Sequence, residues 1–489
     1  MSEPKNNLMI PYGISDFKRI RGEGYYYVDK TEYLAKFESR DSFVFFVRPR
    51  RFGKSLFTNM LQCYYDRREA ANFEKLFGGL WIGAHPTPNR NRYMVLMLDF
   101  SEVNKGSSGS SLEDRFASYM SGKLRMMLEA YPDCFDADFV AEFKQAEVGL
   151  KFNLVMSRAK LRGIPTYLVI DEYDNFTNSL LRATGNEPYK TLTHGTGFYR
   201  EWFKSFKGSF DRIFMTGVSP VTMDDLTSGF NIASNISQDE DFNAMLGFSE
   251  QETLQMYRDF KGTGKFTEGD PEKIVAGIKP WYDGYCFAKE SVGRESVFNS
   301  DMVLYHLKHL VAKGRPPENM VDVNIATDYD KLETIVDLQR LAGETNVEDV
   351  LAQLRNDHRI HQTIRSSFDC EKMTENVVSL LYYHGLITNS GRTCGLDFYC
   401  IPNAIAAFEW IRLVNGIRGL DHDYVFDLEY SEPTAPESDL AAKAADGIEK
   451  LRRYASDRFV PELARGTRLH LILFQFKGTE LVRLEEIPR

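Results

Sequence analysis

A buried strand that runs directly into a Gly-Lys-Ser turn is the feature that most constrains how this chain can fold. The run SFVFFV (42–47) is apolar, aromatic and β-branched, which is typical of a strand buried on both faces of a parallel sheet. RPRRFGKSL follows almost without a break, and helix-like spacing of apolar residues begins in SLFTNMLQCYYDRREA. A strand, a short glycine-containing loop and a helix in this order predict a loop that wraps around phosphate groups.

The loop matches the phosphate-loop (Walker A) pattern GxxxxGK[ST], except that Arg48 stands where the first glycine is expected. Gly53 lets backbone amides approach phosphates, Lys54 supplies a positive charge near the β- and γ-oxygens, and Ser55 offers a hydroxyl to Mg²⁺. The alternative is an exposed basic turn, because Gly-Lys-Ser is a common tripeptide. We predict a nucleotide-binding loop made of Arg48, Pro49, Arg50, Arg51, Phe52, Gly53, Lys54, Ser55 and Leu56.

A second buried strand ends in two acids. In TYLVIDEYD (166–174), Asp171 has the place of a Walker B carboxylate that holds Mg²⁺, and Glu172 can polarise the attacking water. General-base help of this kind contributes roughly 10²- to 10⁴-fold to a rate. The predicted Mg²⁺ ligands are therefore Ser55 and Asp171, and the predicted catalytic residues are Lys54, Glu172 and Thr216.

Thr216 enters this set because it ends a further strand, DRIFMTG (211–217), where a hydroxyl could orient the water that attacks the phosphate. Two more acids have structural alternatives. Asp99, at the end of YMVLMLDF (93–100), is interpreted as a turn former, and Asp174 either supports the site or caps a helix.

Strands of this buried kind alternate with amphipathic helical stretches over residues 1–230, which predicts an α/β domain with a doubly wound parallel sheet. The first 40 residues are expected to form a lead-in that packs on this sheet. Residues 231–405 are dominated by helical patterns, and residues 406–489 return to strands around one long helix. The sequence therefore predicts a P-loop domain, a mostly helical region and a small C-terminal α/β domain.

Composition limits the setting of the protein. The start MSEPKNNLMIPYG lacks the apolar core of a secretory peptide, and no run approaches about 18 apolar residues. Six scattered cysteines fit free thiols in a reducing compartment, so we expect a cytoplasmic protein that does not span a membrane. The formal charge of −10 argues against a surface adapted uniformly to nucleic acid, although it leaves a local basic groove open.

These motifs together resemble the AAA-ATPase-like family of bacteria and archaea, which is often fused to a PD-(D/E)XK nuclease domain. The resemblance rests on RPRRFGKSL, LVIDEYD and FMTGVSPV, and it continues through WYDGYCF, VFNSDMVL, LLYYHGLIT and IPN. It implies an arginine in place of the first loop glycine, a helical lid with a winged-helix-like part over residues 231–405, and a C-terminal nuclease-like domain. The aromatic residues of WYDGYCF are interpreted as packing residues rather than adenine contacts.

The resemblance also places YVFDLEYS at the nuclease strand that normally carries a Glu-x-Lys motif. Glu429 takes the position of the glutamate, but Ser431 stands at that of the lysine, and the chain before Asp421 is short for the strand that bears the aspartate. We therefore expect a shortened PD-(D/E)XK-like domain without nuclease activity. An active domain with a migrated lysine, such as Lys443, is the alternative.

The sequence thus predicts an ATPase that uses ATP and Mg²⁺ and acts as a conformational switch. The family context suggests nucleic-acid processing or defence against mobile elements. Nucleic acid and a partner protein are candidate partners, and the sequence is compatible with an oligomer. Two alternatives stay open, namely an ATP-regulated metal-dependent nuclease and a nucleotide-binding scaffold that does not hydrolyse ATP. The oligomeric state, the biological substrate and the preference for ATP over GTP are not encoded in any recognisable motif.

Overall fold

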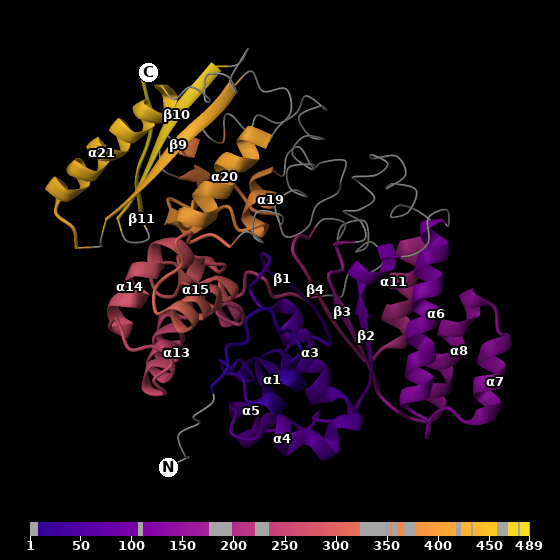
Figure 1. The fold of residues 1–489 in the computed structure, drawn as a ribbon. Helices are drawn as coiled ribbons and strands as arrows, with labels where there is room; N and C mark the ends of the chain where they lie inside the picture. The colour runs from indigo at the N-terminus through magenta and orange to yellow at the C-terminus, as the bar shows by residue number, and fades with distance from the viewer. Residues whose placement is uncertain are drawn as a thin grey trace.

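The computed structural model describes most of the chain as a series of segments. They are residues 8–105, 111–175, 198–220, 234–322, 350, 353–354, 359–365, 377–416, 422–431, 434–456, 468–477 and 480–488. Within these segments, a five-stranded sheet, a helical region with a small sheet and a C-terminal three-stranded sheet follow one another along the chain (Figure 1).

The first sheet is parallel throughout and has the order β2-β3-β4-β1-β5. Its strands are β1 (Phe43–Val47), β2 (Met94–Asp99), β3 (Thr166–Asp171), β4 (Arg212–Gly217) and β5 (Ser234–Asn235). Along β1, Val44 and Phe46 join the core on one face, whereas Phe45 and Val47 join the core on the other. Alternate side chains of a strand point to opposite faces, so this continuous apolar run requires cover on both sides.

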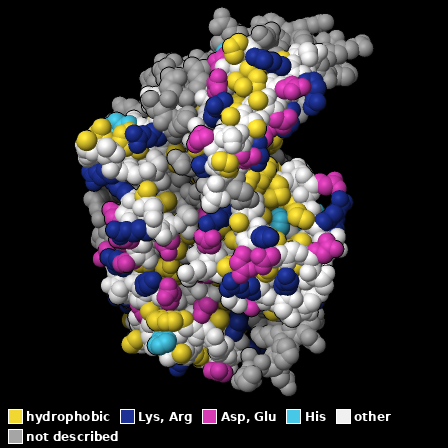
Figure 2. Space-filling model, turned by 90° about the vertical axis from the view of Figure 1, so that its left-hand side faces the viewer, with side chains coloured by type: hydrophobic (Ala, Val, Ile, Leu, Met, Phe, Trp, Pro, Cys, Tyr) yellow, Lys and Arg dark blue, Asp and Glu magenta, His cyan; other side chains and the backbone are white. Residues whose placement is uncertain are grey.

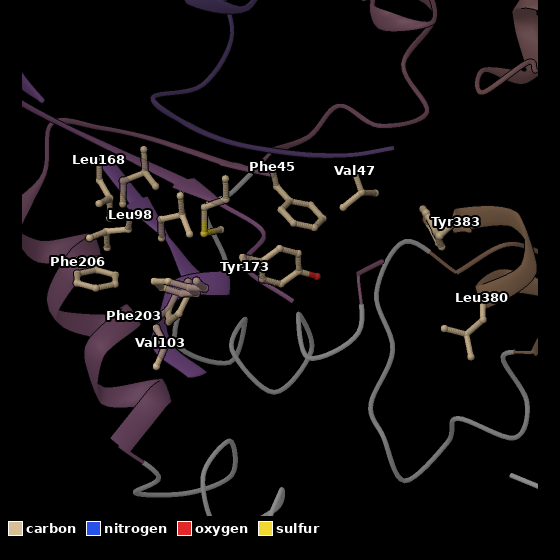
Figure 3. Close-up of a cluster of buried hydrophobic side chains, with 14 of the residues drawn as sticks. Phe45, Val47, Leu98, Val103, Leu168, Tyr173, Phe203, Phe206, Leu380 and Tyr383 are labelled. Carbon is tan, nitrogen blue, oxygen red and sulfur yellow. The ribbon is translucent and has the colours of Figure 1, made fainter. Parts of the chain in front are cut away.

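Helices provide that cover. One face carries α1 (Phe17–Glu23), α2 (Glu32–Glu38), α3 (Lys54–Tyr65), α4 (Phe73–Phe77) and α5 (Trp81–Ala84). The other carries α6 (Leu112–Ala130), α7 (Ala137–Gln145), α8 (Val148–Leu161) and α11 (Phe198–Ser209). Figure 3 shows Phe203 and Phe206 of α11 facing Leu98 and Leu168 of the sheet. The predicted doubly wound α/β fold is confirmed.

The second region begins with a helical core of its own. Its helices are α13 (Glu250–Gly262), α14 (Pro271–Tyr282) and α15 (Ser300–Lys313). A small antiparallel sheet of order β6-β8-β7 follows, flanked by two helices. These elements are β6 (Ile360–His361), α19 (Val377–Tyr383), β7 (Thr388–Thr393), β8 (Leu396–Cys400) and α20 (Ala404–Gly416). Leu380 and Tyr383 of α19 belong to the same core cluster as Phe45 of β1 (Figure 3).

The sequence predicted that the N-terminal lead-in packs on the first sheet. In the structure the lead-in also packs on the second region. Its apolar side chains Leu8, Ile10 and Tyr12 lie against the core of α13–α15, while Phe17 packs beside α3. The Tyr26 hydroxyl donates to Asp259 of α13 at 2.9 Å. The lead-in therefore joins the two regions, a role that only the folded chain reveals because its partners are more than 200 residues away.

The C-terminal unit consists of three strands and one long helix. They are β9 (His422–Ser431), α21 (Glu437–Ser456), β10 (Arg468–Lys477) and β11 (Glu480–Ile487). β10 pairs in parallel with β9 and antiparallel with β11. Gly447 of α21 lies so close to β9 that a methyl group there would come within 2.9 Å of the Glu429 side chain. This contact seats the helix directly over the acidic residues of β9.

Short 3₁₀ helices complete the described elements. They are η1 (Arg67–Asn72), η2 (Phe100–Lys105), η3 (Glu240–Phe242) and η4 (Lys289–Ser291). None of the helices within the described segments is long and apolar enough to cross a membrane.

Candidate nucleotide site

The phosphate loop connects β1 to α3. Gly53 is the residue before the helix and has φ of 96°, a left-handed conformation that glycine adopts without steric cost. The Lys54 ammonium donates to the backbone carbonyls of Arg48 and Pro49, each at 2.9 Å. Burial lowers the pKa of Lys54, an effect that the negative charges of Glu172 and Asp171 oppose. The loop thus folds around its own lysine, at the carboxyl end of a buried parallel strand.

The two predicted acids lie beside this loop. Asp171 is the last residue of β3 and only 4% exposed, and its carboxyl group lies beside the Ser55 side chain. Burial raises the pKa of Asp171 to about 6, although the Ser55 side chain and the charge of Lys54 lower it. Two segments that are more than 100 residues apart in sequence therefore bring a hydroxyl, a carboxylate and an ammonium group together.

Glu172 has a backbone conformation that is unusual for its residue type. Its φ is 49°, and its N–H donates to Asp171 Oδ1 at 2.9 Å. Asn175 Nδ2 donates to Glu172 Oε2 at 2.6 Å, which fixes the carboxylate at the wall of the cavity described next. Strained backbone of this kind concentrates at functional sites when the surroundings hold it in place.

A cavity of about 540 Å³ opens at the loop. Its walls come from the lead-in, from the phosphate loop with Glu172 and Asn175, and from the second region. Seven of the nine residues predicted for the nucleotide-binding loop line it, and these are Arg50, Arg51, Phe52, Gly53, Lys54, Ser55 and Leu56. Pockets of about 300–1,000 Å³ suit small molecules and cofactors.

Arg48 and Pro49 do not line this cavity. The Arg48 guanidinium is buried and donates to the carbonyls of Val47, Ser237 and Phe242 at 3.0, 2.6 and 2.8 Å. It also stacks over Phe46 and Phe287, with its central carbon 4.3 and 4.1 Å from the ring centroids, and burial lowers its pKa to about 9. Arg48 thus contributes a backbone carbonyl to the loop, whereas its side chain ties β1 to the second region.

The remaining polar residues at the strand ends have different surroundings. Thr216 is buried at the end of β4, does not line the cavity, and its hydroxyl has no hydrogen-bond partner within the described part of the chain. Asp174 accepts from the N–H groups of Val218 and Ser219, each at 3.2 Å, so it links the ends of β3 and β4. Asp99 accepts from the Ser101 N–H at 2.8 Å, which agrees with its interpretation as a turn former.

The sequence did not predict the walls that come from outside the ATPase motifs. The lead-in supplies an apolar stretch at Pro11 and Ile14, and the second region supplies others at 245–248, Met256 and Leu304. No local pattern distinguishes these residues from ordinary core positions. Phe52 was predicted to bind nucleotide, but its ring also packs edge-on against Tyr285 and Phe287, at 4.9 and 5.5 Å between centroids. These two rings of WYDGYCF are packing residues, as expected.

The acidic residues of β9 have a basic partner that was not expected. Lys450 of α21 donates to Glu429 Oε1 at 2.7 Å and lies 3.9 Å from Asp427 Oδ2. Lys443 instead donates to the backbone carbonyl of Tyr430 at 2.7 Å. Asp421 lies outside the described residues. Within the described segments, no cluster of three or more His, Cys, Asp or Glu residues is arranged to hold a metal ion.

The parallel sheet, with Gly-Lys-Ser at the end of β1 and two acids at the end of β3, defines a P-loop α/β domain. Residues 11–227 match the AAA-ATPase-like family model, described as a predicted AAA-ATPase. The family match supports nucleotide binding and an ATPase-type function. It does not extend to the second region or the C-terminal unit.

One curated protein is similar to part of the chain. An uncharacterised protein in the vnfD 5′ region of Azotobacter chroococcum is 28% identical over 284 residues, which are 58% of this chain and 49% of that protein. The chain thus matches only about half the length of this curated relative.

The similarity to solved structures is low, as the TM-scores show. The ORC2 protein of Aeropyrum pernix in ADPNP–ADP complexes has a TM-score of 0.34 and 11% identity, with 82% of this chain and 97% of that chain covered. Cdc6p of Pyrobaculum aerophilum has a TM-score of 0.27 and 9% identity, with 79% and 92% covered. Such scores are too low to inform the function.

Proposed function

We propose that this chain binds ATP with Mg²⁺ in the cavity at the end of β1, hydrolyses it, and uses the reaction as a conformational switch. The observation that carries the proposal is the meeting of Lys54, Ser55 and Asp171 at one loop, with Glu172 on the cavity wall. A random basic turn would not combine a buried lysine with a buried carboxylate beside the adjacent serine.

The donor set fits Mg²⁺. The Ser55 hydroxyl and the Asp171 carboxylate offer hard oxygen atoms, and Mg²⁺ is commonly held by one or two such groups together with substrate phosphates. Ser55 and Asp171 would hold the ion, which would supply positive charge against the phosphate groups of the nucleotide. Asp171 is well suited to a cation because its burial disfavours the ionised carboxylate in the absence of one.

The side chains of this chain have separate roles in the proposed reaction. Lys54 exchanges the carbonyls of Arg48 and Pro49 for phosphate oxygens. Glu172, held by Asn175, accepts a proton from the attacking water. The Thr216 hydroxyl, which has no hydrogen-bond partner among the residues that the structure describes, lies one strand away and orients that water.

The composition of the cavity supports the proposed switch. Its walls belong to both the ATPase domain (1–230) and the helical region (231–405), so a nucleotide contacts both at once. We propose that the C-terminal unit (406–489) follows the motion of the helical region. An arginine from a neighbouring copy or partner protein would raise turnover by roughly 10³- to 10⁵-fold, as in other P-loop enzymes.

A cytoplasmic location and a nucleic-acid partner are parts of this proposal that rest on sequence and family context. On the face drawn in Figure 2, acidic and basic side chains are interspersed rather than gathered into a basic stripe. A nucleic-acid partner would therefore bind through a local groove or through an assembled oligomer rather than through this face as a whole.

The test is Mg²⁺-dependent phosphate release from ATP and GTP by the wild type and by Glu172→Gln, with and without DNA. Glu142→Gln, which removes an exposed carboxylate from α7, is the matched control. We expect turnover in the wild type and control, and a loss of at least about 10²-fold in Glu172→Gln with nucleotide binding retained. Binding without turnover in every variant would favour the non-hydrolysing scaffold, and absence of binding would refute the proposal.

For the C-terminal unit we propose a nuclease-like domain without cleavage activity, because Ser431 stands at the lysine position of β9. One observation favours the alternative of an ATP-regulated nuclease: the Lys450 ammonium reaches Glu429 from α21. Metal-dependent cleavage of DNA or RNA that disappears in both Glu429→Ala and Lys450→Met would establish that alternative. Cleavage that survives both substitutions would point to a contaminant.

A further inference from the structure

Arg51 has an unusual conformation within the phosphate loop. Its φ is 67°, in the left-handed region that residues with a side chain rarely occupy. Its backbone carbonyl accepts hydrogen bonds from the Ser300 hydroxyl at 3.1 Å and from the Asp301 N–H at 3.3 Å. The first residues of α15, in the second region, therefore hold this strained residue in place.

The Arg51 side chain makes a second connection to the same helix. Its Nη1 atom donates to Asp301 Oδ2 at 2.9 Å, and the two side chains are 25% and 17% exposed. Both residues line the cavity together with Lys54 and Ser55. A carboxylate in a cavity built for polyphosphate repels that ligand unless a cation neutralises it, so Arg51 has two competing anionic partners once a nucleotide enters.

The rest of the loop is packed tightly against the second region. The Gly247 N–H donates to the Phe52 carbonyl at 3.1 Å, and a methyl group on Gly385 would come within 2.9 Å of the Pro49 ring. The loop thus contacts the second region at Gly247 and Gly385, and α15 contacts it through a polar connection. That ion pair can exchange for a phosphate contact, whereas the apolar contacts have no anionic competitor.

We propose that Arg51 senses the terminal phosphate of the bound nucleotide, and that Asp301 is the residue of the second region that releases Arg51 when this phosphate arrives. The inference rests on the proposed nucleotide binding. It assigns to one ion pair the transmission of the binding signal from the phosphate loop to α15. In the nucleotide-free protein, Asp301 holds Arg51 and the beginning of α15 stays docked. With a triphosphate bound, Arg51 turns to the phosphate, and the beginning of α15 loosens.

The experiment measures hydrogen–deuterium exchange of the full chain over residues 297–307, with a non-hydrolysable ATP analogue, with ADP and without nucleotide. We expect faster exchange of this segment with the ATP analogue than in the other two states. In Asp301→Asn, exchange is fast in all three states, because the ion pair is absent from the start. By linkage, Asp301→Asn binds the ATP analogue roughly 3- to 10-fold more tightly than the wild type.

Two further variants complete the test. Arg51→Met keeps most of the side-chain length without charge, and it is expected to abolish the difference between the ATP analogue and ADP in both exchange and affinity. Glu250→Gln removes a carboxylate of α13 that pairs with Lys279 outside the cavity, and it should behave as wild type.

Unchanged exchange of residues 297–307 on saturation with the analogue overturns the proposal. This holds even if Asp301→Asn binds more tightly, because loss of a repelling carboxylate alone would have that effect. A wild type that binds no nucleotide refutes the proposed function as well, so the two failures are distinguishable.

Discussion

Replacing Asp171 by asparagine should stabilise the nucleotide-free protein while it abolishes hydrolysis. Burial raises the pKa of Asp171 in the folded state to about 6, above its value of 3.8 in the unfolded chain. Ionisation therefore costs the folded state stability once the pH exceeds the unfolded value, and the cost is complete above the folded value. At pH 7 it amounts to about 3 kcal/mol, since each pKa unit is worth about 1.36 kcal/mol.

The pH dependence separates this effect from other consequences of the substitution. At pH 5 the carboxyl group of folded Asp171 is mostly protonated, and the same linkage leaves a cost of only about 1.6 kcal/mol. Asp171→Asn should therefore raise the free energy of unfolding by about 3 kcal/mol at pH 7 and by about half as much at pH 5. Mg²⁺-dependent phosphate release should be lost at both pH values.

The assay is urea unfolding without nucleotide or Mg²⁺ at the two pH values, for the wild type, Asp171→Asn and Asp138→Asn. Asp138 is exposed in the first turn of α7, so its substitution should change stability by less than about 0.5 kcal/mol. If Asp171→Asn raised the free energy of unfolding equally at pH 7 and pH 5, or lowered it at pH 7, the assignment of the cost to the buried charge would be refuted.

Two further predictions concern the connection between the domains. Arg48→Gly, which places a glycine at the first motif position, should lower the free energy of unfolding by about 2–4 kcal/mol. The substitution leaves a cavity and removes the donor to three backbone carbonyls. Urea unfolding of this variant, with Arg50→Gly as the comparison, measures the change. Gly284→Ala should cost more than about 3 kcal/mol, because the methyl group would lie 2.2 Å from the Pro402 carbonyl oxygen at φ of 92°. Gly264→Ala has a similarly positive φ but open space, and thermal unfolding should show a loss of only about 1 kcal/mol for it.

The polar residues near the phosphate loop show where motif reasoning reaches its limit. The spacing of Gly53, Lys54 and Ser55 identified the loop because their chemistry is local to one strand and one helix. The side chain of Arg48 could not be placed in the same way. Its direction depends on carbonyls at 237 and 242 and on Phe287, which no pattern near residue 48 encodes.

The C-terminal unit gives a parallel case. Sequence analysis predicted a strand, a long helix and a strand pair, and these elements are present. The sequence named Lys443 only as an example of a migrated lysine in the alternative of an active nuclease, whereas the structure brings Lys450 to Glu429. These lysines are seven residues apart on α21, so they share one face of the helix about 10 Å apart, and the position of the helix along β9 decides which one reaches the carboxylate.

The sequence by itself determined the elements whose cause is local. These are the buried parallel strands, the Gly-Lys-Ser loop and the two acids that follow β3, because hydrophobic periodicity and backbone requirements act over a few residues. Only the tertiary structure decided that the lead-in and α15 complete the cavity, and that Asp301 pairs with Arg51 across 250 positions of the chain. Contacts of this range depend on how separate apolar cores pack against one another, which single-residue patterns do not specify.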